Sequence, residues 1–424
     1  MSLGAMETTP KRSRTEDKRP GVDPTDDELR VPPGSSSWVW HHFRISDIPE
    51  TKGWAICLHC RHWLKYCRST SSFEYHLKRI HQLSNGQPAP SALDSSFLLP
   101  DAFNTENVGM DALIFGKKTD VLSVDQFSLE SLGEIFTLAD KFRDAVQIRG
   151  SLDILKGRLM STIFYEPSTR TSTSFQAAML RLGGSVVPIN TLTSSVAKGE
   201  SLSDTMKTLE SYSDIIVIRH PEVGSAQLAA ESVSVPVINA GDGIGEHPTQ
   251  ALLDIYTIMR ECGRLHDLKI TMVGDLKHGR TVHSLSKLLC LYSGISMNFI
   301  SPSNLCMPRD VIEKIRTNSG ITVFQASDLN SVLPETDVLY VTRIQKERFA
   351  SPQEYKEAEG KYIITPGILQ IAKPSCVIMH PLPRVNEISV EVDQDPRAAY
   401  FRQMRNGLFV RMALVYKCLG GSKI

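Results

Sequence analysis

The sequence predicts an α/β protein in which two tandem domains each carry a doubly wound parallel sheet. Short apolar runs recur along the chain, and each is followed by a polar loop and then by a helical pattern. At 424 residues the chain also exceeds one ordinary hydrophobic core, so two or three domains are expected. A smaller module with a cysteine and histidine pattern of its own precedes the two sheets.

The segments predicted to be strands share apolar residues with Gly, Pro, His or Arg directly behind them. They are 159–164, 214–219, 235–239, 268–273, 338–341 and 376–379. Before the first of these, Leu129, Leu132 and Ile135 recur at the spacing of one helix face, which predicts a helix from Ser128 onward.

The change in composition along the chain predicts its division into domains. The expected parts are a disordered tail at 1–36, a finger module at 37–85, a linker at 86–117, α/β domains at 118–260 and 261–404, and a C-terminal helix at 405–424 that packs back on the first α/β domain.

The composition excludes several classes of protein. Hydrophobic residues make up 41% and charged residues 22%, and the formal net charge is zero, so no overall field attracts nucleic acid or a membrane surface. No apolar run is long enough to span a bilayer, and eight cysteines in so long a chain are not a disulfide framework. We expect a cytoplasmic protein with no membrane partner. The basic cluster at 11–14 leaves a nuclear location as the alternative.

The segment that ends near His81 has the spacing of a zinc site. Two residues separate Cys57 from Cys60, and His76 and His81 follow after a gap of fifteen residues. Two thiolates from a hairpin and two imidazoles from one helical turn make a closed tetrahedral zinc site. A module with so small a core would take its folding energy from this structural zinc. The alternative is four surface residues that share the spacing by accident.

The same segment opens with aromatic residues at 38–43, and with this spacing it resembles the BED-type zinc finger. That resemblance implies DNA binding. The basic residues that would contact phosphates, Lys65, Arg68, Lys78 and Arg79, are weak support for it, so DNA stays an open partner.

The stretch 164–171 predicts an anion site at a strand-to-helix turn. Pro167 ends the strand, and Ser168 or Thr169 is expected to cap the helix that follows. Arg170 stands at the positive end of this helix, where backbone N–H groups and hydroxyls bind phosphate-like anions. The alternative is an ordinary capped helix with one surface arginine.

Five more loops place Arg, His or Gln directly behind a predicted strand. They are 219–221, 241–250, 274–281, 342–348 and 380–384. Ligands of parallel sheets bind beyond the carboxyl ends of the strands, so these groups are expected to meet there. Their summed positive charge predicts a small substrate with several negative charges.

Other chemistries lack their sequence signatures. The chain has no P-loop, no dinucleotide-binding turn and no Gly-x-Ser-x-Gly elbow, and its loops lack a carboxylate cluster suited to Mg²⁺. What remains is group transfer between small anions without a catalytic cofactor.

Three of these motifs carry a resemblance to a known family. Residues 167–171, 247–250 and 380–384 resemble the signature motifs of the aspartate/ornithine carbamoyltransferase family, over about residues 118 to 420. Within it, the transcarbamoylase domain of the animal multifunctional pyrimidine-synthesis protein is the most similar. The resemblance implies carbamoyl transfer from carbamoyl phosphate to L-aspartate, which gives N-carbamoyl-L-aspartate and phosphate in an early step of de novo pyrimidine biosynthesis.

Aspartate is favoured over ornithine as the amine. Ornithine-specific members of the family have a cysteine at the position that Pro381 occupies here. Ornithine also carries a cation, whereas Arg280 and Arg343 suit the two carboxylates of aspartate.

The resemblance implies a role for each matching residue. The phosphate of carbamoyl phosphate would be held by Ser168, Thr169, Arg170 and Thr171. Its carbamoyl end would meet Arg219, His247 and Gln250, and the groups that polarise the carbonyl would be Thr171, Arg219 and His247. Aspartate would be fixed by Arg280, Arg343 and Gln345, with the backbone of Leu382 and Pro383 receiving its amine. For His247 the alternative is a satisfied loop histidine or a helix cap.

The loop 193–200 is polar and hinged by glycine, which predicts a mobile lid. The resemblance implies a homotrimer in which this loop reaches the neighbouring subunit, where Ser194 and Lys198 complete the binding site for carbamoyl phosphate and Lys198 also meets aspartate.

The sequence leaves two rival functions open. One is a zinc-finger DNA-binding protein whose transferase body is an inactive scaffold. The other is an ornithine-type carbamoyltransferase. The finger itself is a departure from the family, which does not ordinarily carry one.

Overall fold

The computed structural model describes residues 119–420, apart from 192, 318–320 and 350, and four short strands nearer the N-terminus. The chain separates into two compact units, Met1–Phe103 and Asn104–Ile424.

In the first unit the described strands form one antiparallel sheet in the order β1-β2-β3-β4. Their bounds are β1 Leu29–Arg30, β2 Phe43–Ser46, β3 Trp54–Cys57 and β4 Trp63–Lys65. Strand β1 lies inside the tail for which disorder was expected. Backbone pairing to the edge of β2 forms it, and the polar composition of the tail gives no sign of such pairing.

Of the four predicted zinc ligands, only Cys57 lies among the described residues. Cys57 is the last residue of β3, whereas Cys60, His76 and His81 lie outside the described residues, as do the basic residues Arg68, Lys78 and Arg79. The expected linker at 86–117 lies outside them too.

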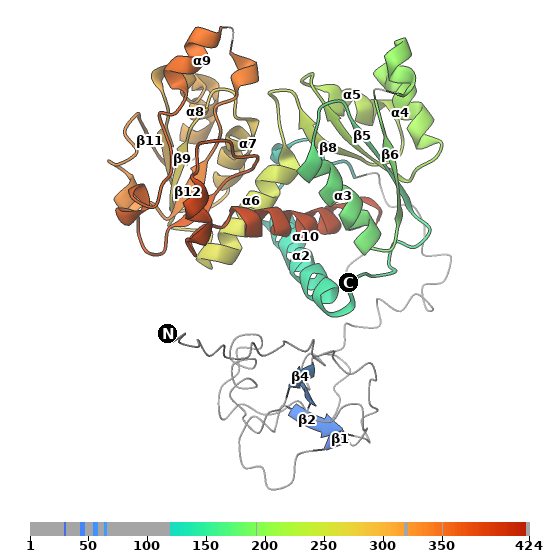
Figure 1. Cartoon of the computed structure of the whole chain (residues 1–424). Coiled ribbons are helices and arrows are strands. Elements are labelled where there is room, and N and C mark those ends of the chain that lie inside the picture. The colour runs from blue at the N-terminus through green and yellow to red at the C-terminus, as the bar shows by residue number, and fades with distance from the viewer. Residues whose placement is uncertain are drawn as a thin grey trace, which may run out of the picture. The chain divides into compact units, whose positions relative to one another are not determined.

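The second unit begins with a four-stranded parallel sheet in the order β6-β5-β7-β8 (Figure 1). Its strands are β5 Leu159–Phe164, β6 Ser185–Ile189, β7 Ile215–His220 and β8 Val237–Asp242. The helices of this half are α2 Leu129–Arg149, α3 Thr169–Arg181, α4 Leu202–Glu210, α5 Ser225–Ser232 and α6 Pro248–Cys262.

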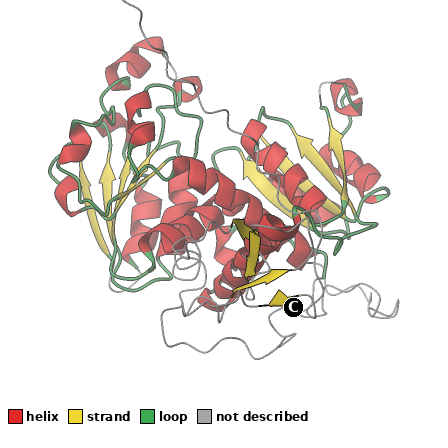
Figure 2. Cartoon of the chain, turned by 60° about the horizontal axis from the view of Figure 1, so that its bottom comes forward, coloured by secondary structure: helices red, strands yellow, loops and turns green. Residues whose placement is uncertain are grey.

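A second parallel sheet follows, with five strands in the order β11-β10-β9-β12-β13. Its strands are β9 Lys269–Val273, β10 Ser296–Ile300, β11 Thr322–Ala326, β12 Val338–Val341 and β13 Val377–Met379. Its helices are α7 Arg280–Leu289, α8 Arg309–Arg316 and α9 Pro352–Ala358. Two parallel sheets in tandem confirm the predicted fold class, and Figure 2 shows helices beside each sheet.

The six predicted strands are present, but β6, β10 and β11 had not been predicted. Strand β6 contains Pro188 and is largely accessible, as is β11, and both lie at the edge of their sheets. Edge strands need no continuous apolar run because one side faces solvent, so periodicity gives a weak signal for them.

The last helix, α10 Tyr400–Cys418, joins the two halves. It contacts α2, α3 and α6 in the first half and β13 in the second (Figure 1). Gly407 lets it approach α6, because a Cβ there would lie 2.9 Å from Cδ2 of Leu253. It begins at Tyr400, ahead of the predicted start at 405. Among the described residues, no helix has both the length and the apolar character that crossing a membrane would require.

Candidate active site

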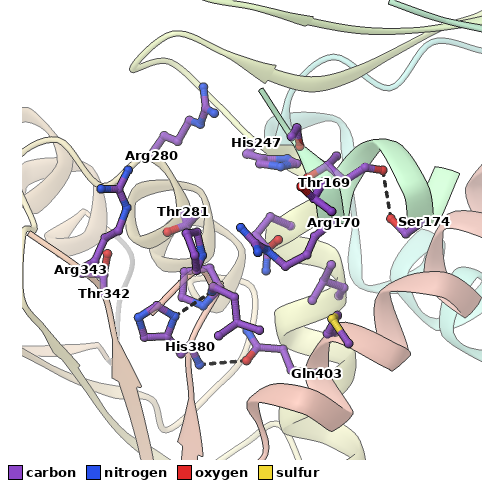
Figure 3. Close-up of a pocket in the computed structure, with 18 of the residues that line it drawn as sticks. Thr169, Arg170, Ser174, His247, Arg280, Thr281, Thr342, Arg343, His380 and Gln403 are labelled. Atoms are coloured by element: carbon purple, nitrogen blue, oxygen red, sulfur yellow. Dashed lines mark hydrogen bonds between the residues drawn. The ribbon is translucent and has the colours of Figure 1, made fainter. Parts of the chain in front are cut away.

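A cavity of about 460 Å³ lies where the carboxyl ends of strands from both sheets meet (Figure 3). Each sheet reverses its direction of winding there, at β5 and at β9, which is where open parallel sheets bind ligands. The structure brings together in its wall these predicted residues: Ser168, Thr169, Arg170, Thr171, Arg219, His247, Gln250, Arg280, Arg343, Gln345, Leu382 and Pro383.

The turn from β5 into α3 forms one end of the cavity. Ser168 occupies the N-cap position of α3, yet its hydroxyl makes no capping bond, and Thr169 is already inside the helix, so the predicted side-chain cap is wrong. The Ser168 hydroxyl instead accepts a long hydrogen bond, 3.4 Å, from Nη1 of Arg219. The first N–H groups of α3 therefore have no side-chain cap and open at the cavity wall.

Arg170 adds positive charge at this helix end. Burial, and then the charges of Arg219 and Arg343, lower the pKa of Arg170 below its ordinary value. A cation destabilised by its neighbours in this way is stabilised by an anion placed between them. This end of the cavity therefore favours a phosphate group.

His247 stands at the N-cap of α6 and is buried, with 4% of its surface exposed. It makes no capping bond, and its Nδ1 has no hydrogen-bond partner, so the alternatives of a satisfied histidine or a cap fail. Burial, and then the charges of Arg280 and Arg219, hold the pKa of His247 well below its usual value. Its imidazole is therefore neutral and donates a hydrogen bond from one ring nitrogen only.

Glu166 lies within the stretch 164–171 but was not predicted as a site residue. Its Oε2 accepts from Nε of Arg219 at 2.9 Å and from Nη2 of Arg280 at 3.4 Å, and Oε1 lies 4.0 Å from Nη2 of Arg348. Although burial alone would raise the pKa of Glu166, the two nearest arginines hold it below its usual value. One carboxylate thus joins the first half of the site to the second.

Arg280, the first residue of α7, is held close to the first half. Its Nη1 donates to the carbonyl of Gly243, and a Cβ on Gly241 would lie 3.0 Å from its guanidinium carbon. Gly241 has φ +121°, so only glycine fits both the backbone and the space. Burial, and then Arg219, lower the pKa of Arg280 to about 10.

The loop behind β13 forms the opposite wall. The Leu382 N–H donates to Nδ1 of His380 at 2.7 Å, so the ring proton of a neutral His380 sits on Nε2, which lies 2.7 Å from Glu387. The backbone N–H of His380 donates to Gln403 at 2.9 Å (Figure 3). These contacts fix Leu382 and Pro383 at the cavity.

Several cavity residues had not been predicted, and most come from helix interiors. They include Ser174, Leu253, Gln403, Met404 and Arg411. Thr281, Thr342 and His380 also line the cavity, and these lie in the loops that were expected to meet, although no role was predicted for them. Arg411, on α10, is 3% exposed and donates from Nη1 to the Ser174 hydroxyl at 2.8 Å. Burial lowers its pKa to about 10. A lone arginine in a predicted packing helix gives no sequence signal for a site.

Ser194 and Lys198 do not line this cavity. Ser194 precedes the 3₁₀ helix η9 (Ser195–Lys198), and its hydroxyl donates to the Thr191 carbonyl at 3.2 Å. Lys198 is exposed. Within the part of the chain that the structure describes, no group of three or more His, Cys, Asp or Glu side chains could hold a metal ion.

Family models match most of the chain. Residues 119–260 match the carbamoyl phosphate-binding domain of aspartate/ornithine carbamoyltransferases, and 266–418 match the aspartate/ornithine-binding domain. Residues 37–82 match the BED zinc finger.

Individual relatives agree with these models. The chain is 56% identical to the multifunctional protein CAD of Squalus acanthias over 71% of this chain and 13% of that protein, so it spans about an eighth of that relative. It is 51% identical to the aspartate carbamoyltransferase catalytic subunit of Thermococcus onnurineus, over 72% of this chain and 98% of the subunit.

Among solved structures, aspartate transcarbamoylase of Trypanosoma cruzi in complex with carbamoyl phosphate and aspartate is similar, with a TM-score of 0.69 and 44% identity over 71% of this chain and 96% of that one.

Proposed function

Because this chain belongs to the aspartate/ornithine carbamoyltransferase family, we propose that it transfers the carbamoyl group of carbamoyl phosphate to the amine of L-aspartate. It is an enzyme of the aspartate carbamoyltransferase type, to which its relatives of about 50% identity belong. The observation that carries the residue roles is the meeting of uncapped N–H groups, hydroxyls and arginines from both domains in one cavity. The product would enter de novo pyrimidine biosynthesis.

The phosphate binds at the start of α3. Its oxygens accept from the N–H groups of the first turn and from the Ser168, Thr169 and Thr171 hydroxyls, with Arg170 supplying a full positive charge. When the phosphate group is bound here, the carbamoyl carbon points toward the middle of the cavity.

The carbonyl oxygen is polarised by Thr171, Arg219 and His247. As aspartate's amine attacks, the oxygen gains negative charge, and these donors are already positioned in the cavity wall to stabilise it. A neutral His247 donates a hydrogen bond to this oxygen, and Arg219 supplies the charge.

Aspartate is bound by the second half. Arg280, Arg343 and Gln345 hold its carboxylates, and the backbone of Leu382 and Pro383 directs its amine at the carbonyl carbon. Holding the reactants in this geometry can lower the activation barrier by up to about 7–11 kcal/mol.

No covalent nucleophile and no catalytic cofactor are needed. The amine forms the new C–N bond, the tetrahedral intermediate expels phosphate, and the departing phosphate oxygens take up the amine proton. Phosphate is a good leaving group, so the substrate is already activated.

The site is completed by a second copy of the chain in a homotrimer. The support for this is that Ser194 and Lys198 lie outside the cavity of their own chain, while the solvent-exposed Lys198 can reach another. A lysine from the neighbour would contact both the phosphate and aspartate.

A structural zinc would be held by Cys57, Cys60, His76 and His81. Cys57 ends a strand of an antiparallel hairpin, and Cys60 lies in sequence between β3 and β4, which suits a thiolate pair from a hairpin. The match to the BED finger favours DNA as a second partner.

The test is a turnover assay on the purified chain, with aspartate and ornithine compared as amines and zinc content measured on the same sample. We expect carbamoylaspartate to form and one zinc per chain. A preference for ornithine would overturn the proposed substrate.

A gel-shift assay with and without chelator tests the finger. Retarded DNA that is released by chelator supports a DNA partner, whereas no retardation with zinc present removes DNA as a partner.

A further inference from the structure

Directly behind the cavity wall, one buried carboxylate joins three elements. Asp254, on α6, has no exposed surface. Its Oδ1 accepts from Nε2 of Gln250 at 2.9 Å and from Nε2 of Gln403 at 2.6 Å, and its Oδ2 accepts from the Tyr340 hydroxyl at 2.7 Å. Gln250 also lies on α6, Gln403 on α10 and Tyr340 on β12. None of these contacts takes part in the proposed chemistry directly.

The carboxylate decides which way the Gln250 amide points. An ionised carboxylate only accepts hydrogen bonds, so the amide NH₂ must face Asp254. A proton on Oδ2 would not change this, because both glutamines reach Oδ1. Gln250 lines the cavity, and its carbonyl oxygen is the end of the amide that remains for a ligand.

The neighbouring glutamine is fixed at both ends. Nε2 of Gln403 donates to Asp254, and its Oε1 accepts from the His380 backbone N–H at 2.9 Å. Gln403 therefore cannot turn over to offer Asp254 its oxygen. The amides of Gln250 and Gln403 donate to the same atom, Oδ1 of Asp254. Because Gln403 cannot turn over, this shared acceptor holds Gln250 in a single orientation.

We propose that Asp254 is a positioning residue that makes Gln250 an acceptor for the carbamoyl NH₂, so that the site distinguishes carbamoyl phosphate from acetyl phosphate. The proposal rests on the proposed function of the same cavity. Acetyl phosphate has a methyl group in place of the carbamoyl NH₂ and cannot donate. A reversed Gln250 would instead direct its own NH₂ at that of the substrate, donor against donor.

A purely structural role for Asp254 predicts a different result. Asp254 links α6, α10 and β12, so its loss would loosen the cavity and weaken all phosphate ligands together. A positioning role predicts that the ratio of carbamoyl phosphate to acetyl phosphate affinity falls, while inorganic phosphate binds as before.

The experiment compares Asp254→Leu with the matched control Tyr340→Phe in the full chain. Binding of carbamoyl phosphate, acetyl phosphate and inorganic phosphate is measured by calorimetry. Asp254→Leu removes the acceptor of Gln250, and we expect the affinity ratio to fall about tenfold. Tyr340→Phe removes a donor to the same carboxylate but leaves Oδ1 in place, so its ratio should stay within about twofold of wild type.

Asp254→Asn should keep the ratio of carbamoyl phosphate to acetyl phosphate affinity within about threefold of wild type. Its one oxygen accepts from both glutamines while its NH₂ faces Tyr340. If Asp254→Leu does not fold, Asp254→Val, which also offers no acceptor, replaces it, with the same expected loss. An unchanged ratio in the folded acceptor-free variant, or an equal loss for all three ligands, overturns the proposal.

The two proposals fail separately. A wild-type chain that binds these ligands but transfers no carbamoyl group to aspartate would sink the proposed function, and the affinity ratio would still decide the role of Asp254. A wild-type chain with full turnover and an unmoved ratio would sink the role of Asp254 alone.

Discussion

The two halves of the cavity are built differently. In the first half, Thr171, His247 and Gln250 lie in or directly before the first turn of a helix and are at most 7% exposed. In the second half, Arg343 and Gln345 lie in the loop behind β12 and are half-buried. The first half is therefore set mainly by the starts of helices, whereas the second combines one helix start, at Arg280 of α7, with loops.

The difference teaches that the two substrates meet sites of unequal rigidity. A helix terminus holds its N–H groups in place whether or not a ligand is bound, whereas loops with few buried contacts open more easily. With the proposed roles, the phosphate site would be formed in the free chain, and the aspartate site would be completed as its loops close on the ligand. Substitutions in the two halves should consequently fail in different ways.

The largest expected effect comes from Arg170→Ala, compared with Arg343→Ala. Loss of Arg170 removes charge from the phosphate in the transition state, so kcat/KM should fall by about two orders of magnitude or more, with weaker binding of inorganic phosphate. Loss of Arg343 should raise the KM for aspartate and leave phosphate affinity close to wild type. Steady-state kinetics with both substrates varied will distinguish them. Near-normal turnover of Arg170→Ala would refute its phosphate role.

The next effect tests whether a second chain completes the first half of the cavity. Lys198→Ala and Arg170→Ala chains should each be inactive alone. Mixed, denatured and reassembled, they should regain about a quarter of wild-type activity, because that share of random subunit contacts pairs an intact Arg170 with an intact Lys198. Reassembled single-mutant samples are the controls. Hybrids that stay inactive would exclude shared sites.

The sequence alone predicted which residues of the loops behind the strands line the cavity. The central strands are continuous apolar runs, and motifs such as 167–171 and 247–250 carry their chemistry within a few neighbouring residues. Both kinds of signal are local, which is why all twelve predicted residues of the chain's own cavity lie in its wall.

What the sequence did not reveal depends on contacts between distant segments. Arg411 and Gln403 enter the site only because α10 crosses back against α3 and α6. Asp254 looks like one polar residue among the apolar residues of α6 until Gln403 and Tyr340 are seen to donate to it. The predicted cap at Ser168 failed because its hydroxyl faces Arg219 instead of the helix.

A smaller effect is expected at the contact between the halves. Glu166→Gln keeps the shape of the side chain but removes the charge that joins Arg219 to Arg280. We expect the KM for aspartate to rise about tenfold, because Arg280 loses a charged partner that positions it. Binding of inorganic phosphate should be unchanged or tighter, because a nearby negative charge is gone. A fall in phosphate affinity with an unchanged aspartate KM would place Glu166 entirely in the rigid half.

The smallest expected effect is on the stability of the fold. It tests how tightly the first half of the cavity is packed around Asp254. Burial raises the pKa of Asp254 from 3.8 to about 7, against the opposing hydrogen bonds of Gln403 and Tyr340. Between these two values the folded chain binds a proton that the unfolded chain does not. Asp254 therefore stabilises the fold most at acidic pH, and this contribution is lost as pH rises through about 7.

Asp254→Asn does not titrate, so it isolates this effect. As pH falls from 8 to 5, the melting temperature of wild type should rise by a few degrees relative to that of Asp254→Asn, since all other groups titrate alike in the two chains. Thermal unfolding followed by circular dichroism at both pH values measures the difference. A difference that does not change with pH would mean that Asp254 stays ionised throughout. The hydrogen bonds of its three donors would then outweigh its burial, and the rigid half of the cavity would hold a permanent negative charge beneath Gln250.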